Sequence, residues 1–458
     1  MVPFSEHYSA DHSDNPTVEI DIDGETLLIT KSLADALGRM REKDADCRVL
    51  WVDAICINQG DVAERSQQVA LMGRIYKCSN RVLVWLGDKD EYTNEAISLI
   101  KTISEFPVES YANSRITFAD WNTPERLAHM TGVQGIPQWT DWVALMVFFQ
   151  RPWFERVWII QEVILGSEVL VFCGSGVIPW VEISRTVQFI GTTSWSMQLV
   201  LSRFRKMPEV EMELDAESWN PRKRKYHKLI NDKQLDFSLN ETILVLEGAR
   251  SDFRGKRLYF EDLISSFRSF KATDPRDMVF SLLGIAPKDK PPFATHPGQL
   301  VPDYTIATTT MYTRVARMLL DVYGDLFLLD HVEDKSFRSV KDLPSWVPDY
   351  SVPLMPLPWV TTNRIRHPVC NANNGIAWRL TKPASLEESE LMVQGVHLDA
   401  VSRGASKRSD EPGDVFQTWK FPQELANMAR LSCGIGIHQD PKAIRCVYLR
   451  FPKTSSCN

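Results

Sequence analysis

The sequence predicts an α/β fold with a parallel sheet over its first part, followed by a mixed, mainly helical region that carries some strands. Two apolar runs of strand length, residues 48–52 and 81–87, predict buried strands. Between them, residues 61–78 have apolar positions at helical spacing. A strand, a helix and a strand joined by short links imply a right-handed crossover and parallel strands.

A hairpin and a helix are predicted before the first apolar run. Residues 18–22 alternate apolar and acidic side chains, Asp23-Gly24 is typical of a tight turn, and residues 27–29 are predicted to return as a second strand. A helix is then expected from Ser32, which we predict to be its cap, with Asp35 three residues later.

The tract from Trp51 to Gln59 is expected to be the end of an inner strand covered on both faces, because the preceding run is apolar on both faces. The helix that follows is predicted to be capped by Asp61, with Glu64 reaching back to complete a capping box.

Further along, helices are expected at residues 94–103 and 139–149, separated by an irregular insertion over 106–138. Apolar runs within 151–182, and a helix started by Pro179, complete a first domain of residues 1–190. Residues 191–240 are charged and predict a linker or insertion, and 241–458 predict a C-terminal α+β region. That region includes a helix around 311–320 and strands beyond residue 385, such as 391–393.

Composition narrows the class of protein. A net charge of −7 argues against a nucleic-acid binder, which needs a basic face. No apolar window is long enough to span a membrane, and the first residues are not typical of a secretory signal, so we expect a cytoplasmic protein. The basic run Arg222–Lys225 is either a nuclear-import signal or a solvated loop. The cysteines lack zinc-site spacing, so neither a metal nor a cofactor is expected.

Two polar groups are candidate binding residues. Asp53, Asn58 and Gln59 follow the first apolar run, and ligands of open α/β sheets bind at the carboxyl ends of strands. The alternative is that the neighbouring Asp61 and Glu64 only cap a helix.

The second group lies in residues 151–162. Arg151 and Arg156 could hold an anionic ligand, and Trp153 could provide a stacking face. Gln161 is a further polar candidate, and Glu162 is the candidate catalytic residue, as a general base or as the group that stabilises a developing cation. The alternative is a structural lock between arginine and carboxylate groups. A common crevice would bring both groups together.

These blocks resemble the fungal heterokaryon-incompatibility (HET) domain family. The resemblance is carried by residues 50–59 with Asp61, Glu64, 68–69, Met72, 75–76 and 82–87, and by 151–154, 156–158, 161–163 and 173–174. Residues 274–277, 283–284, 302–304 and 343–351 are similar to the region that follows this domain in many large members. One departure is that the opening Leu-Ser-Tyr-x-Trp-Gly motif of the family lacks its Trp-Gly in the corresponding residues 4–11. The chain is therefore expected to have either a mis-assigned start or a degenerate first motif, and its C-terminus looks clipped beside longer relatives.

The resemblance implies an effector of cell death in non-self recognition, with a fold related to the Toll/interleukin-receptor (TIR) domain. Some TIR domains hydrolyse NAD with a glutamate, so the resemblance implies Glu162 as the catalytic residue, with NAD as a substrate and with Asp53, Asn58 and Arg156 around the nucleotide. Self-association or protein partners would activate it. Two alternatives stay open, namely a non-enzymatic signalling module and a degenerate relative without activity.

Overall fold

The computed structural model describes residues 2–5, 17–22, 24–41, 49–106, 139–192, 239–296, 298, 300–323, 326–353, 390–395 and 447–450. The chain divides into two compact units, Met1–Ala372 and Asn373–Asn458. In the second unit the described elements are the antiparallel strands β8 (Met392–Gly395) and β9 (Val447–Arg450), which confirm strands beyond residue 385. The predicted insertion after residue 106, most of the predicted linker 191–240 and the basic run Arg222–Lys225 lie outside the described residues, so the predicted domain boundaries stay predictions.

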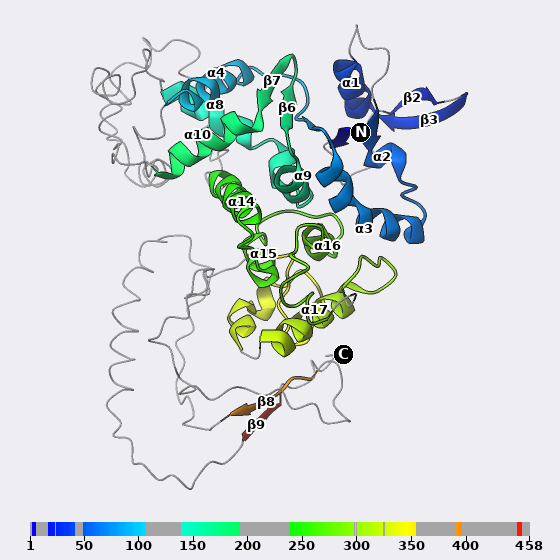
Figure 1. Cartoon of the computed structure of the whole chain (residues 1–458), viewed down its shortest axis with the longest axis vertical. Helices are drawn as coiled ribbons and strands as arrows, with labels where there is room; N and C mark the ends of the chain where they lie inside the picture. Colours follow the sequence, from blue (N-terminus) through cyan, green and yellow to red (C-terminus); the bar gives the residue numbers. More distant parts are fainter. Residues whose placement is uncertain are drawn as a thin grey trace. The chain divides into compact units, whose positions relative to one another are not determined.

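A five-stranded sheet organises the first unit (Figure 1). Its order is β4 (Leu50–Val52), β1 (Val2–Ser5), β5 (Val82–Trp85), β6 (Val169–Cys173) and β7 (Gly176–Pro179). The first four strands are parallel, and β7 returns antiparallel to β6 after a turn in which Gly174 has a φ of +52°. Parallel strands are thus confirmed, and β5 is an inner strand with every residue buried.

The prediction that Trp51–Gln59 ends an inner strand is wrong. β4 is an edge strand that pairs only with β1 among the described strands, and the chain enters the short helix α2 (Asp53–Cys56) directly after it. Trp51 and Val52 are nevertheless buried, because Val52 packs in the cluster that contains Leu33 of α1 and Trp51 packs against Tyr76 of α3. An apolar run therefore indicates covered faces and says nothing about which neighbour pairs with the strand edge.

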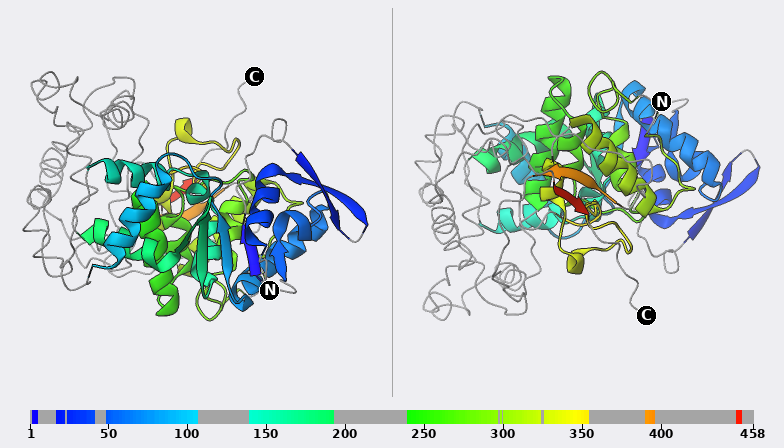
Figure 2. Two further views of the ribbon diagram at one scale, coloured as in Figure 1. Left: turned by 90° about the horizontal axis from the view of Figure 1, so that it is seen from above. Right: turned by 90° about the horizontal axis from the view of Figure 1, so that it is seen from below.

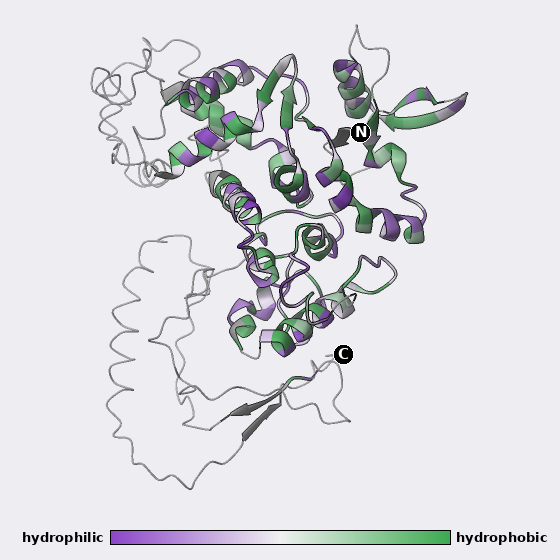
Figure 3. Cartoon of the chain, viewed as in Figure 1, coloured by the Kyte–Doolittle hydropathy of each residue, from purple (hydrophilic) through white to green (hydrophobic). Residues whose placement is uncertain are grey.

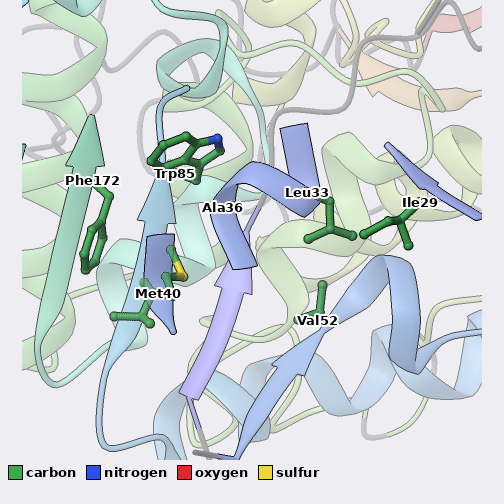
Figure 4. Packing of buried hydrophobic residues seen from close by; sticks show 8 residues of the cluster. Ile29, Leu33, Ala36, Met40, Val52, Trp85 and Phe172 are labelled. Carbon is green, nitrogen blue, oxygen red and sulfur yellow. The ribbon is translucent and has the colours of Figure 1, made fainter. Parts of the chain in front are cut away.

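Helix α1 (Lys31–Met40) covers one face of the sheet together with the hairpin of β2 (Thr17–Ile22) and β3 (Glu25–Thr30). The hairpin turns at Gly24, whose φ is +88°, as the Asp-Gly pair predicted, and it projects beyond the sheet (Figure 2). The helix begins earlier than predicted: the cap is Thr30, whose hydroxyl accepts from the Leu33 amide, and not Ser32. The residues that form this core are Ile29, Leu33, Ala36, Met40, Val52, Leu83, Trp85 and Phe172 (Figure 4).

Helices α3 (Val62–Cys78) and α9 (Ile159–Leu165) cover the other face. Trp51 meets Tyr76 of α3 edge to face, with ring centroids 6.1 Å apart. Gly166, at the end of α9, lies so close to the sheet that a Cβ there would be 2.9 Å from a Val82 methyl group. Colouring by hydropathy shows α9 and β6 as largely hydrophobic segments (Figure 3), as expected for elements packed in the interior.

Three helices pack beyond β7: α4 (Thr93–Ser104), α8 (Trp139–Phe149) and α10 (Trp180–Thr192) (Figure 1). Their positions confirm the predicted helices at 94–103 and 139–149 and the helix after Pro179. Between α8 and α9 lies the 3₁₀ helix η1 (Pro152–Glu155). The described residues contain no helix that is long and apolar enough to cross a membrane.

The region after residue 238 is mainly helical. Its elements are α14 (Leu239–Arg254), α15 (Phe260–Ser266), α16 (Asp277–Leu283), α17 (Thr308–Tyr323), η2 (Phe327–His331) and η3 (Lys335–Phe337). Helix α14 contacts α9 and α10, and α16 contacts α3 and α9, so this region packs directly on the first domain.

A buried ionic network holds the end of this region. Arg268 bonds to the Glu333 carboxylate at 2.7 Å and to the carbonyls of His331 and Asp349, while the Asp349 carboxylate accepts the Val340 amide. Residues 343–351, part of the family resemblance, therefore have a structural role here.

A glycine contact between α3 and α16 gives a first testable prediction. A Cβ on Gly73 would lie 2.7 Å from the Gly284 Cα, whereas a Cβ on Gly38 of α1 meets nothing within 4 Å. We expect Gly73→Ala to lower the free energy of unfolding by about 1–3 kcal/mol through overpacking. Gly38→Ala should raise it by about 0.5–1 kcal/mol, because alanine loses less backbone entropy in a helix. Urea titrations of both variants test this, and equal stabilisation by both would show that α3 and α16 do not touch.

Candidate functional site

Glu162 is a buried carboxylate held by a tryptophan. It lies in the first turn of α9 with 1% of its surface exposed. Its Oε2 accepts a hydrogen bond of 3.0 Å from the indole Nε1 of Trp153, which is wholly buried in η1. The Trp153 ring in turn packs edge to face against Phe154 and Trp180, with centroids 5.1 and 6.0 Å away. The aromatic packing therefore fixes the donor that holds the carboxylate.

Three further polar side chains surround this carboxylate. Burial raises the pKa of Tyr76 well above its usual value, the nearby charges of Glu162 and Asp53 raise it further, and Arg156 opposes them. Burial likewise raises the pKa of Asp53, and the Arg156 guanidinium counteracts this. The charges of Asp53, Arg156 and Glu162 thus all act on Tyr76, and we call these four residues the polar cluster.

Each member comes from a different place in the chain. Asp53 begins α2 directly after β4, and Tyr76 lies near the end of α3. Arg156 follows η1, and Glu162 lies in α9. The backbone at Arg156 is held by the neighbouring amide of Val157, which donates to the Lys271 carbonyl at 2.9 Å. Asp53 belongs to the first group of predicted residues and Glu162 to the second, and both act on Tyr76.

Asn58 and Gln59 lie in the exposed loop that leads into α3. The Asn58 carboxamide accepts the Gly60 amide at 3.1 Å, and the Gln59 amide donates to the Asp53 carbonyl at 3.3 Å. Asp61 caps α3 as predicted by accepting the amides of Ala63 and Glu64. The reciprocal bond differs from the expected capping box, because the Glu64 carboxylate accepts the Asn58 amide. These contacts shape a turn, and a ligand role for Asn58 and Gln59 stays a prediction.

Arg151 lies at a separate place, at the carboxyl end of β5. Its guanidinium donates to the carbonyls of Leu86 and Asp88, to the Asp90 carboxylate at 2.8 Å and to the Thr93 hydroxyl. This is the lock between arginine and carboxylate that the sequence left open as an alternative. The loop it fixes turns at Gly87, whose φ of +91° favours glycine.

Gln161 faces the C-terminal region. Its amide donates to the Ser281 carbonyl of α16 at 2.7 Å. Trp153 offers no open stacking face, because the whole ring is buried. Of the predicted residues, Asp53, Arg156 and Glu162 therefore share a neighbourhood with Trp153 as a hydrogen-bond donor, while Arg151 and Gln161 are engaged elsewhere.

Tyr76 was not among the residues predicted for the site. Its position matched the apolar stripe of the helix 61–78, and a tyrosine in such a stripe is usually read as core. The available signal was its hydroxyl, since a buried tyrosine hydroxyl usually needs a polar partner.

The fold and the cluster define a class: an α/β domain with parallel strands, in which buried and half-buried polar side chains gather beside the sheet. The family model described as "Heterokaryon incompatibility protein (HET)" matches residues 5–162, a range that contains every member of the polar cluster. The chain is also similar to "Heterokaryon incompatibility protein 6, OR allele" of Neurospora crassa, with 26% identity over 362 residues.

This protein therefore carries a segment, residues 5–162, that matches the heterokaryon incompatibility (HET) family. The similarity to the Neurospora protein covers 71% of this chain and 48% of the relative, so the chain spans about half the length of the curated relative it matches. No solved structure matches the chain significantly.

The bond from Trp153 to Glu162 gives a second prediction. Trp153→Phe keeps an aromatic ring but removes the indole donor, so the buried carboxylate loses a partner. We expect the free energy of unfolding to fall by about 1–3 kcal/mol. A matched carboxylate control is Glu155→Gln, which breaks only a surface pair with Lys271, worth about 0–1 kcal/mol. Chemical denaturation of both variants checks this, and a Trp153→Phe protein as stable as wild type would contradict the assigned bond.

Proposed function

We propose that this protein is an effector of heterokaryon incompatibility, which acts in non-self recognition and promotes programmed cell death. The observation that carries the proposal is the HET match over residues 5–162, which spans the polar cluster. The similarity to a Neurospora protein named for heterokaryon incompatibility supports the same role. Protein partners or self-association would engage it.

The contacts of Glu162 favour a non-enzymatic signalling module. A general base must lie within hydrogen-bond reach of the proton that it takes. Glu162 is 1% exposed, and Trp153 already donates to its carboxylate. In this conformation the polar cluster therefore stabilises the packing of α9 and α3 on the sheet, and the surface of the domain carries the signal to partners.

TIR-like NAD hydrolysis is the second candidate, on a TIR-like arrangement of the parallel strands. It is favoured by one observation: Arg156 lowers the pKa of Asp53, and Asp53, Arg156 and Glu162 all act on the pKa of Tyr76. A half-buried arginine whose charge acts on a nearby carboxylate is a group that could bind a phosphate, and a buried glutamate could stabilise a developing cation. In this candidate Glu162 is catalytic, and Arg156 and Asp53 contact the nucleotide. Asn58 and Gln59, in the exposed loop that leads into α3, complete the residues proposed to bind ligand in this candidate.

The two candidates differ in the effect of Glu162→Gln. The variant keeps the shape of the side chain and an oxygen that accepts from Trp153. For a signalling module, we expect induced expression in a fungal host to kill cells as wild type does, without loss of cellular NAD. For NAD hydrolysis, loss of the carboxylate would cut NAD turnover by roughly 100- to 10,000-fold, the usual contribution of a general acid or base.

Glu155→Gln is the matched control, because it removes a carboxylate from the partly exposed surface close by in sequence. Thermal melts of each variant separate a loss of function from a loss of fold. Abolished killing and NAD turnover in a folded Glu162→Gln protein would reject the signalling module in favour of the enzyme. Harmless expression of the wild type would reject the effector role itself.

A further inference from the structure

The two helices that hold Tyr76 and Glu162 are themselves covered by the C-terminal region. Helix α16 contacts both α3 and α9. At this contact a Cβ on Gly73 would lie 2.7 Å from the Gly284 Cα, and a Cβ on Gly284 would lie 2.7 Å from the Gln161 side chain. There is therefore no room for a side chain at Gly73 or at Gly284, and glycine at both positions allows the close approach of α3, α9 and α16.

A polar network joins the same surfaces. The Asp277 carboxylate of α16 accepts from the Trp158 indole at 3.3 Å and from the Tyr304 hydroxyl. The Arg65 guanidinium of α3 lies over the Tyr304 ring at 3.7 Å and bonds to Asp274 at 3.4 Å. Two loop segments around Asp274 and Tyr304 are thus tied to α3 and to the residue that precedes α9.

Several polar groups lose hydration when they are buried in this contact, and the contact does not fully replace it. Gln161 Oε1 and Ser281 Oγ are buried without a hydrogen-bond partner among the residues that the structure describes. Burial raises the pKa of Asp277 to about 6, which means that the charged form is disfavoured in the closed contact. Water would solvate all three groups well, so opening this contact recovers hydration that closing it removes.

We propose that the contact of α16 and the Tyr304 segment with α3 and α9 is a releasable latch, which restrains the helices of the polar cluster and opens while the sheet stays folded. Opening would uncover α3 and α9 for partners. The further step, that opening promotes cell death, rests on the proposed function.

The network makes the latch sensitive to pH. The titratable and charged groups around Asp277 are Arg65 of α3, Asp274 and Arg276 in the preceding turn, and Tyr304. An opened Asp277 returns to water and to its usual pKa near 4, so the closed state binds the proton more tightly. The closed latch is thus most stable below about pH 4 and weakens as pH rises to about 6, where a difference of roughly two pKa units makes opening roughly 100-fold more frequent.

Hydrogen exchange in the full chain, followed by mass spectrometry, tests the latch. In Tyr304→Phe, which removes the hydroxyl that donates to Asp277, we expect faster exchange in residues 62–78 and 159–165 and unchanged exchange in β5 and β6. Tyr323→Phe is the matched control, since its hydroxyl donates to the Pro291 carbonyl away from the latch. In wild type, exchange of the two helices, corrected for its intrinsic pH dependence, should rise between about pH 4 and 6, and Asp277→Asn should remove this rise.

Unchanged exchange of both helices in Tyr304→Phe, or exchange that rises equally in β5 and β6, would overturn the latch. If that variant does not fold, Ser66→Ala gives the same test, because the Ser66 hydroxyl accepts the Tyr304 amide at 3.1 Å. Killing assays separate the two proposals. A variant that opens and kills more strongly than wild type supports both, whereas opened variants and a wild type that are all harmless reject the proposed function and leave the latch standing.

Discussion

The burial of the Glu162 carboxylate is the constraint on which the rest of the structure depends. A buried carboxylate is costly unless hydrogen-bonding groups compensate for it, and here the nearby 3₁₀ helix η1 provides one. Trp153 provides the indole donor, and the charges of Glu162, Asp53 and Arg156 all act on Tyr76 of α3. The helical layer on this face of the sheet is therefore specified by electrostatics as well as by its apolar packing.

The same layer links the HET domain to the region that follows it. Helix α16 lies against α3 and α9, and the Asp274–Asp277 turn bonds to side chains of the first domain. Residues 274–277 and 302–304, which look like separate motifs in the sequence, meet here because Arg276 bonds both to Asp274 and to the Tyr304 carbonyl. The packed unit is thus larger than the segment that the family model matches, and α16 contacts both helices that carry Tyr76 and Glu162.

Local signals in the sequence predicted elements well, and long-range partners explain where prediction failed. The Asp61 cap, the Gly24 turn and the helix 139–149 depend on neighbouring residues, and all three were confirmed. The strand 50–52 was placed inside the sheet because both its faces are apolar, but its position depends on β1, which inserts between β4 and β5. Arg151 and Gln161 were predicted beside Glu162, yet their partners lie in the loop after β5 and in α16, which no local pattern reveals.

Asp53 and Arg156, about a hundred positions apart in the sequence, lie close enough for Arg156 to lower the pKa of Asp53. A double-mutant cycle with Asp53→Asn and Arg156→Gln measures this interaction in the free energy of unfolding. We expect a coupling energy of about 0.5–3 kcal/mol, the range found for residues in one charged network. Additive effects of the two substitutions would contradict the cluster and the packing of α9 that it explains.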